Sequence, residues 1–374
     1  MYKDYFYSLA TDKPRPCAQG RGKSRSYCSN VIKFFLFILS LFYGLGLKIL
    51  IFFCSLKAYR LNCKVISVGN ITWGGTGKTP LVEAITRYLK QEGHKTAILT
   101  RGYGRKIAGC GLRLPAGKAR VAGYENMGDE PYMLSKNLVD IPVIVDANRI
   151  RAANRALRDY GVDGVILDDG FQQWRIKKDL EIVAIDASNP FGNRHLLPRG
   201  ILREPLSSLR RADVFVLTKT NLMPDTKGLR DFLTVINPRA GIFESIHSPV
   251  GFYRVDDPGE LLEPNLFKGK TVTLISAIAD PDSFENLIIG LGLNIGLSFR
   301  FSDHHVYSDA DFADIVKKSQ EKNIDAIVTT EKDSPRLTFR ELKPGTKIFV
   351  LKIELKLTAH EKEFFNRIHG VFTD

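Results

Sequence analysis

The stretch KVISVGNITWGGTGKTPLVEAITRYLKQEGHKTAILT at residues 64–100 decides the fold class of this 374-residue chain. It opens with an apolar run at 65–68, which is typical of a buried strand, and continues through a glycine-rich loop. Apolar residues then recur at helical spacing from 79 to 91, and a second apolar run follows at 96–99. The order strand, loop, helix, strand predicts a βαβ unit of a parallel sheet.

The loop of this unit has the residue types of a phosphate-binding loop. Its glycines let backbone N–H groups turn toward a phosphate, Lys78 can reach the phosphate oxygens, and the Thr79 hydroxyl can bind Mg²⁺. The usual pattern has glycine where this chain has Thr72, although other glycines follow closely. We predict nucleotide binding at Thr72, Trp73, Gly74, Gly75, Thr76, Gly77, Lys78 and Thr79.

A pair of carboxylates, Asp168 and Asp169, follows the apolar run at 165–167. The carboxyl end of such a strand faces the phosphate loop in a P-loop fold, so one acid can bind Mg²⁺ while the other polarises a neighbour. The sequence Asp-Asp-Gly also favours a turn, which is the simpler structural interpretation. The phosphate loop upstream favours the functional one.

Two further segments contain candidate acids and bases. Asp129 and Glu130 come just before a proline-started helical stretch, where acids also serve as helix caps. His304 lies beside Asp303 in a polar loop, and a carboxylate next to a histidine can raise its basicity toward an alcohol proton. Taken alone, the first segment indicates a cap and the second a solvated loop.

Alternating strand and helix patterns continue along the chain and predict a mainly parallel α/β sheet with helices on both faces. The P-loop kinase domain is predicted at 61–240, and the segment 248–258, with prolines near both ends, is predicted to link it to a smaller C-terminal α/β domain within 241–374. Further strands are predicted at 141–145, 165–167, 182–185, 214–217, 271–275, 324–329 and 347–351.

The N-terminal sixty residues predict a membrane-associated helix preceded by a basic, disordered tail at 1–30. Residues 34–56 are almost entirely apolar, which is long enough for a membrane helix, but Lys48 divides the run. Basic residues on both sides give no orientation, so we favour insertion into the interface over a true span. A cleaved signal peptide is the alternative, and no small-residue cleavage site follows the run.

The composition gives a formal net charge of +13, which suits an anionic partner such as a phospholipid surface or phosphate groups. No helix-turn-helix, zinc-finger spacing or RNA-binding box is found, so we do not expect nucleic acid as a partner. The five cysteines lie far apart with no C-x-x-C spacing, which favours free thiols in a reducing compartment.

An ordered set of motifs resembles the tetraacyldisaccharide 4'-kinase family of lipid A biosynthesis. The resemblance runs from residue 31 to about 334, and any single motif is weak whereas the ordered set is specific. Residues 1–30 lie outside it, and Gln173 stands where the family often has histidine. The motifs are VISVGNITWGGTGKTP (65–80), TRGYGR (100–105), GDEPYML (128–134), DDGFQ (168–172), FGN (191–193), LLPRGILREPLSSLRRAD (196–213), VLTK (216–219), FSDHH (301–305) and VTTEKD (328–333).

The resemblance implies transfer of the γ-phosphoryl group of ATP, with Mg²⁺, to the 4'-hydroxyl of a lipid A disaccharide 1-phosphate. It implies that Asp129 accepts the hydroxyl proton, with His304 orienting it, while Arg203 neutralises developing charge. The enzyme is expected as a monomer on the anionic cytoplasmic face of the bacterial inner membrane. The remaining implied residues are Lys78 and Asp169 in catalysis, Thr79, Asp168, Asp169 and Glu204 around the metal, and Glu130 and Gln172 near the substrate.

Two other functions and one motion remain to be weighed. A membrane-bound P-loop nucleotide switch would use the Thr218–Asn221 segment, yet Asn221 replaces the acid that reads guanine, which favours ATP. A lipid-binding protein without enzymatic activity would need neither Lys78 nor the acid pairs. If Asp129 and His304 belong to different lobes, their pairing requires closure of the lobes around ATP and substrate.

Overall fold

The computed structural model describes residues 24–102, 112–114, 127–337 and 347–373. The described chain groups into two compact units that interleave in sequence. The first contains the residues up to Lys78, Asp169–Glu244 and the segment from Lys362 onward, and the second contains Thr79–Asp168 and Ser245–Glu361. The domain boundaries predicted at residues 60 and 240 follow chain order instead, and they stay a prediction. Most of the predicted basic tail, at 1–23, lies outside the described residues.

The first unit is built on parallel strands. Strand β1 (Lys64–Gly69) pairs with β6 (Leu180–Asp186), β6 with β7 (Val214–Thr218), and β7 with the start of β8 (Gly241–Arg254). Apolar residues of β6 and β7 pack with the loop after β1, with the 3₁₀ helix η1 (Leu206–Arg211) and with α8 (Lys227–Ile236) in one buried cluster. The C-terminal helix α12 (Glu361–Thr373) belongs almost entirely to this unit.

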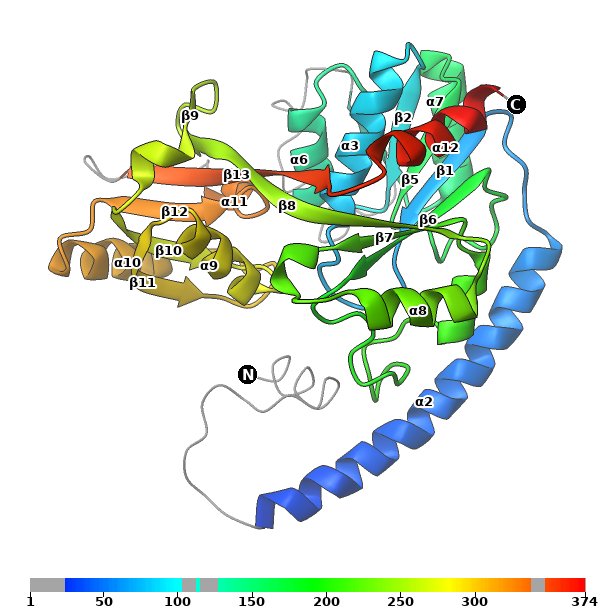
Figure 1. The fold of residues 1–374 in the computed structure, drawn as a ribbon, viewed down its shortest axis with the longest axis horizontal. Helices are drawn as coiled ribbons and strands as arrows, with labels where there is room; N and C mark the ends of the chain where they lie inside the picture. The colour runs from blue at the N-terminus through cyan, green and yellow to red at the C-terminus, as the bar shows by residue number, and fades with distance from the viewer. Residues whose placement is uncertain (1–23, 103–111, 115–126, 338–346, 374) are drawn as a thin grey trace. The chain divides into compact units, whose positions relative to one another are not determined.

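Helix α2 (Ser24–Leu56), drawn in blue in Figure 1, is the longest helix of the described chain. Its segment Asn30–Leu56 is long and apolar enough to cross a membrane, with a mean hydropathy of 2.3, a criterion that a signal sequence also meets. Leu36, Ser40 and Leu47 are buried, while the other large apolar side chains of the helix are mostly exposed. The helix therefore has one narrow packed face and a broad apolar face that no described residue covers.

The second unit contains two groups of strands. In the first group β2 (Thr96–Thr100) pairs in parallel with β4 (Val143–Val145) and β5 (Gly164–Asp168), and β3 (Leu112–Leu114) pairs antiparallel with β4. The helices that accompany these strands are α3 (Lys78–Gln91), α6 (Asp129–Asn137) and α7 (Arg149–Tyr160).

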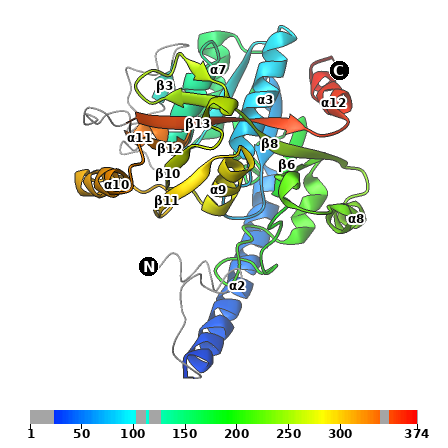
Figure 2. The ribbon, with the colours of Figure 1, turned by 60° about the vertical axis from the view of Figure 1, so that its left-hand side comes forward.

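In the second group, β10 (Thr271–Ser276) lies between β11 (Asn294–Arg300) and β12 (Ala326–Thr330), and β12 pairs with β13 (Lys347–Leu357), all in parallel. Figure 2 shows β12 and β13 side by side. The rest of β8 pairs antiparallel with β13 and with the short β9 (Leu261–Leu262). The 3₁₀ helix η3 (Pro264–Phe267) also belongs to this unit, whereas the 3₁₀ helix η2 (Thr220–Leu222) follows β7 in the first unit.

Side chains of this second group alternate between two apolar layers, as a period of two along a strand requires. Ile348 and Val350 of β13 pack in the cluster that contains Ile315 of α10 (Asp309–Glu321), while Phe349 packs in the cluster that contains Phe284 of α9 (Pro281–Gly290). The short helix α11 (Ser334–Leu337) contributes Leu337 to the α10 side. Helices therefore cover both faces of these strands.

The predicted fold class, a mainly parallel α/β sheet with helices on both faces, is confirmed. Each strand range predicted from the sequence falls on an observed strand, with ends that differ by up to six residues, the largest difference being at β13. Residues 248–254 of the predicted link belong to strand β8, which runs from one unit into the other. The segment is extended because β-forming residues there pair with β13 on its open edge.

One close approach fixes the turn that follows the paired acids. A Cβ atom added at Gly69, the last residue of β1, would lie 2.4 Å from the backbone nitrogen of Phe171. The Gly170 nitrogen also donates to the Val68 carbonyl at 3.0 Å. Glycine is thus required at position 69 for the turn carrying Asp169 to lie against the end of β1.

Substitution Gly69→Ala is expected to lower the free energy of unfolding by roughly 1–3 kcal/mol, because the methyl group overlaps backbone that cannot move without disrupting the turn. Urea titration followed by circular dichroism measures the change. Gly290→Ala is the matched control, since a Cβ atom there meets nothing within 4 Å. Equal stability of the two variants would contradict the proposed close approach.

Candidate active site

The glycine-rich loop is held by backbone contacts within the first unit. The Trp73 nitrogen donates to the Ile201 carbonyl at 2.7 Å, and the Thr218 hydroxyl donates to the Thr76 carbonyl at 3.0 Å. Gly74 and Gly77 have φ values of 128° and 73°, which side chains other than glycine adopt only with strain. Gly74 and Gly77 are therefore needed for this loop conformation, and phosphate binding by the loop stays a prediction.

Lys78, Asp169 and Arg203 form a group that we call the phosphate-side cluster. The Lys78 ammonium lies 3.6 Å from Asp169 Oδ1. The Arg203 guanidinium donates to both Asp169 oxygens, from Nη1 to Oδ1 at 2.8 Å and from Nη2 to Oδ2 at 3.1 Å. Asp169 has a left-handed backbone with φ of 53°, so it occupies the turn that the sequence allowed as an alternative. The two interpretations are compatible, because Asp169 lies in a turn and its carboxylate still contacts the two cations Lys78 and Arg203.

Glu204, predicted near the metal, is fully buried and engaged by neutral and cationic donors. Its carboxylate accepts from Gln172 at 3.0 Å, from the Trp174 indole at 3.2 Å and from Arg211 at 2.9 Å. These contacts join Glu204 to Gln172, which the sequence placed near the substrate. The described contacts position the loop that carries Arg203, and a role of Glu204 as a metal ligand stays a prediction.

Asp129 and His304 meet within the second unit, as the resemblance implies. Asp129 begins α6, but Gly128 holds the cap position and no side chain caps this helix end, so the cap interpretation of Asp129 does not apply. Its Oδ2 atom lies 2.9 Å from His304 Nδ1. Because an ionised carboxylate only accepts hydrogen bonds, Nδ1 is the nitrogen that carries the proton.

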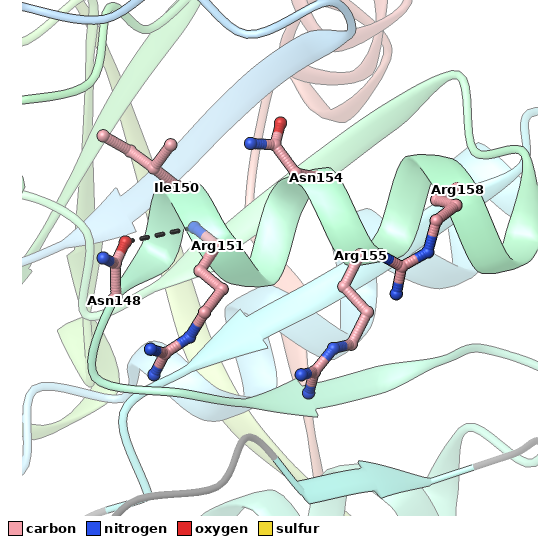
Figure 3. A pocket seen from close by; sticks show the side chains of 6 residues that line it. All are labelled: Asn148, Ile150, Arg151, Asn154, Arg155 and Arg158. Carbon is pink, nitrogen blue, oxygen red and sulfur yellow. Dashed lines mark hydrogen bonds between the residues drawn. The ribbon is translucent and has the colours of Figure 1, made fainter.

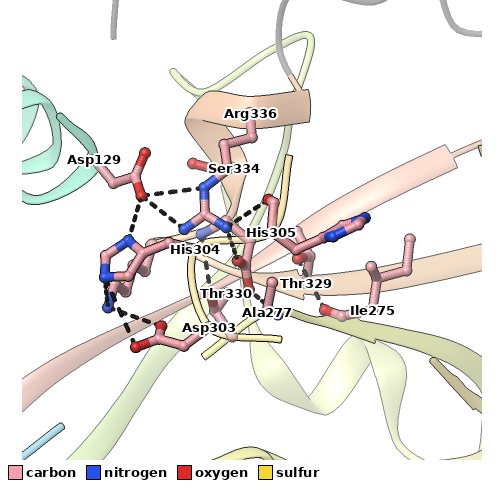
Figure 4. Close-up of polar contacts among 12 residues, drawn as sticks. Asp129, Ile275, Ala277, Asp303, His304, His305, Thr329, Thr330, Ser334 and Arg336 are labelled. Atoms are coloured by element: carbon pink, nitrogen blue, oxygen red, sulfur yellow. Dashed lines mark hydrogen bonds and ion pairs between the residues drawn. The ribbon is translucent and has the colours of Figure 1, made fainter. Parts of the chain in front are cut away.

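Arg336, on α11, lies beside Asp129 and His304 (Figure 4), and we call these three residues together with Lys332 the base cluster. The Nε and Nη2 atoms of Arg336 donate to Asp129 Oδ2 at 3.2 and 2.8 Å. The Lys332 ammonium lies 3.5 Å from His304 Nε2 and 3.6 Å from Glu130. Sequence analysis missed Arg336, because 207 residues separate it from Asp129 and no local pattern marks it.

The charge state of Asp129 follows from these partners. Burial disfavours its ionised form, but the hydrogen bond from His304 and the charge of Arg336 outweigh burial and hold the pKa of Asp129 below its usual range. All of its described contacts are made by Oδ2, so among the described residues Oδ1 has no hydrogen-bond partner. The arrangement is an ionised carboxylate with one anchored oxygen and one oxygen available to a hydroxyl proton.

The expectation that this pair forms only on lobe closure is wrong. Asp129 and His304 both belong to the second unit and are already within hydrogen-bonding distance. His304 lies in the loop that follows β11. The backbone nitrogen of His304 donates to the carbonyl of Ala277, directly after β10, at 3.2 Å, which holds this loop within the second unit. The second histidine, His305, bonds to Asp311 at the start of α10.

Asp168 is suited to a hard cation. It ends β5 at 2% exposure, and its Oδ2 atom accepts from the Thr100 hydroxyl at 3.0 Å. The predicted donors Asp168 and Thr79 offer oxygen atoms only, which is the donor type that Mg²⁺ prefers. Within the described ranges, no group of three or more His, Cys, Asp or Glu side chains forms a metal cluster. Mg²⁺ commonly needs only one or two protein carboxylates besides substrate phosphates.

A separate hollow of about 450 Å³ lies along α7 and is shown in Figure 3. Two of its arginines pair with adjacent carboxylates, Arg151 with Asp146 at 2.7 Å and Arg158 with Asp159 at 3.0 Å. These pairs weaken its attraction for an anion. Its lining residues are Asn148, Ile150, Arg151, Asn154, Arg155 and Arg158, none of which was predicted as a site residue.

Comparisons with known proteins identify the family of this chain. The family model described as tetraacyldisaccharide-1-P 4'-kinase matches residues 32–373. The tetraacyldisaccharide 4'-kinase of Halothermothrix orenii is 34% identical over 89% of this chain and 91% of its own, and that of Syntrophus aciditrophicus is 35% identical over 90% and 92%. The crystal structure of LpxK from Aquifex aeolicus in complex with ATP superposes with a TM-score of 0.74 at 29% identity, covering 91% of this chain and 99% of that chain.

A buried acid network connects α3, the end of α6 and the segment after β12. Asn137, the last residue of α6, donates to Glu83 of α3 at 2.9 Å and to Glu331 at 3.3 Å. Burial raises the pKa of Glu83 to about 7, with the nearby Glu331 charge adding to the effect. An acid with a raised pKa stabilises the fold while it is protonated, so this contribution is lost as the pH rises from about 4.5 to about 7.

Substitution Glu83→Gln is therefore expected to raise the melting temperature at pH 8 relative to the parent chain, and to change it little at pH 4. At pH 8 the gain in the free energy of unfolding should be about 1–3 kcal/mol. This range follows from roughly 1.4 kcal/mol per pKa unit, reduced for structural relaxation around the charged group. Thermal unfolding across this pH range measures it. Glu321→Gln, at an exposed position of α10, serves as control, and a parallel pH dependence in both variants would contradict the buried-acid explanation.

Proposed function

This chain belongs to the tetraacyldisaccharide 4'-kinase family, and we propose that its two clusters transfer the γ-phosphoryl group of ATP to the 4'-hydroxyl of a lipid A disaccharide 1-phosphate. It is a kinase of lipid A biosynthesis. The observation that carries the assignment of roles is the base cluster, in which a carboxylate anchored through one oxygen leaves the other for a hydroxyl.

In the proposed step Asp129 acts as the general base. Its Oδ1 atom takes the proton of the 4'-hydroxyl while the hydroxyl oxygen bonds to the γ-phosphorus. The bond from that phosphorus to the β–γ bridging oxygen breaks, and ADP leaves with the electron pair. His304 orients the carboxylate through Nδ1–H, which keeps the free oxygen directed at the hydroxyl.

The phosphate-side cluster supplies positive charge to the nucleotide. Lys78 would leave Asp169 to reach the β and γ oxygens, and Arg203 would neutralise charge that develops on the transferring group. Asp169 holds the Arg203 guanidinium in place, which lowers the reorganisation that catalysis requires. Glu130 and Gln172 are assigned to the surroundings of the substrate.

We also assign Mg²⁺ to this chain. Thr79 and Asp168 would hold it, and the ion would supply positive charge that neutralises the phosphate groups of the nucleotide. The support is the chemistry of the donor set: a hydroxyl at the start of α3 and a buried carboxylate at the end of β5, already oriented by the Thr100 hydroxyl.

We place the enzyme, as a monomer, on the cytoplasmic face of the bacterial inner membrane. Helix α2 supports this location, because its exposed side chains are mostly apolar and the side chains of Lys33, Lys48 and Lys57 can reach anionic headgroups. The cytoplasmic side follows from the supply of ATP. The nucleotide-switch alternative is not favoured, since the matched relatives are named as kinases.

Lys78→Ala and Asp129→Asn are each expected to reduce labelling of the lipid by roughly 10²–10⁴-fold, because one removes a phosphate contact and the other the base. The measurement is transfer of radiolabel from γ-labelled ATP to a lipid A disaccharide 1-phosphate by the purified chain. Circular dichroism should show normal folding of both variants.

The exposed ion pair between Lys90 and Asp140 offers matched controls of the same chemistry. Lys90→Ala and Asp140→Asn should retain near-normal turnover. An unlabelled lipid with the parent chain would favour a nucleotide switch or a lipid-binding protein. Normal turnover by either active-site variant would overturn the role given to that residue.

Phe42→Asp is expected to weaken binding to anionic phospholipid vesicles by about tenfold or more, since it replaces an apolar side chain of α2 that is 70% exposed by a charge. Vesicle flotation measures bound and free protein. Val235→Asp, at an 83% exposed position of α8, is the control and should bind like the parent chain. Equal loss in both variants would argue against α2 as the membrane contact.

A further inference from the structure

The environment of Arg336 differs from that of a structural arginine at the surface. Its side chain is 2% exposed and joins Asp129, the His305 carbonyl at 3.0 Å and Asp333 at 3.3 Å. Asp333 is itself fixed, because its Oδ2 atom accepts from the Ala277 nitrogen at 3.1 Å and from the Thr330 hydroxyl at 2.8 Å. The guanidinium is therefore held by two contacts besides those to Asp129.

Arg336 and His304 both contact the same oxygen of Asp129. Two guanidinium donors and one imidazole donor converge on Oδ2, at 2.8, 3.2 and 2.9 Å. A single donor would allow the carboxylate to rotate about its Cβ–Cγ bond and exchange its oxygens. Donors from two elements, the loop after β11 and helix α11, fix that rotation and determine which oxygen stays available.

We propose that Arg336 is a positioning residue for phosphoryl transfer: it locks Asp129 through Oδ2, selects Oδ1 as the proton acceptor, and keeps the carboxylate ionised. This inference rests on the proposed role of Asp129 as base. Arg336 does not touch the substrate in this scheme, and its effect passes entirely through Asp129.

Other charged groups also face Asp129 and its partners. Lys332 lies beside His304 Nε2 and Asp303, Glu130 pairs with Lys332, and Asp333 contacts Arg336 from the opposite side. Removal of the Arg336 charge leaves the His304 hydrogen bond and these groups in place. The pKa of Asp129 should then rise, since the charge of Arg336 is among the interactions that lower it.

The test is the pH dependence of kcat/KM for Arg336→Gln and Arg336→Lys in the full chain, measured with ATP and the lipid disaccharide. For Arg336→Gln the acid limb should move to higher pH by about one unit, as expected on losing an adjacent cation. Its kcat should fall about tenfold or more through loss of alignment, with KM for ATP little changed. The kcat and the acid limb of Arg336→Lys should lie between those of the parent chain and those of Arg336→Gln, because ammonium keeps the charge but not the forked geometry.

Arg300→Gln is the matched control, since Arg300 pairs with Glu285 and Asp282 at a partly exposed position of the same unit. Its pH profile should superpose on that of the parent chain. An acid limb that does not move in Arg336→Gln, with only the melting temperature lowered, would show a structural role and overturn the proposal. If Arg336→Gln does not fold, Arg336→Lys carries the test, and a parent-like kcat and pH profile for it would have the same meaning.

Asp129→Asn separates this inference from the proposed function. Substantial turnover by Asp129→Asn would show that Asp129 is not the general base, and this result would overturn both proposals. An inactive Asp129→Asn together with an unmoved acid limb in the Arg336 variants would remove only the role of Arg336.

Discussion

A carboxylate that is withdrawn from water must be held by cations or N–H donors, and this constraint organises both clusters of the chain. Asp129 is held by Arg336 and His304, Asp169 by Lys78 and Arg203, and Glu204 by Arg211 with two neutral donors. In each case the partner also sets the direction of the carboxylate. Under the proposed function, the contacts that compensate for burial also orient the carboxylates for phosphoryl transfer.

The first unit joins the apolar helix to the chemistry of the phosphate-side cluster. The Tyr43 hydroxyl of α2 donates to the Arg203 carbonyl at 2.8 Å, and the Phe37 ring packs edge-on against His195 at 5.6 Å. Gly44 allows Leu196 to approach, since an added Cβ atom would lie 2.8 Å from it. The helix thus packs on the loop that ends in Arg203, so the exposed apolar face of α2 and the Arg203 guanidinium belong to the same unit.

In the second unit, parallel strand order assembles the base cluster. Strands β10, β11 and β12 run in parallel as neighbours, so the segments after their carboxyl ends meet at one edge of the sheet. Ala277 follows β10, His304 follows β11 and Lys332 follows β12, and all three belong to the contact network around Asp129 or its partners. Topology accounts for contacts that the linear distance between these residues conceals.

The local sequence determined the elements and the class of chemistry: the glycine-rich loop between β1 and α3 follows from residue type and spacing, and the strand ranges follow from apolar runs. The ordered motifs identified the family, whose matched range and relatives cover nearly the whole chain. Only the tertiary structure decided that Asp129 is not a helix cap, that Glu204 is enclosed by donors, and that Arg336 contacts Asp129 across 207 residues. The physical reason is that hydrophobic periodicity and turn chemistry act over a few residues, whereas the orientation of a carboxylate depends on donors that sheet topology brings from distant parts of the chain.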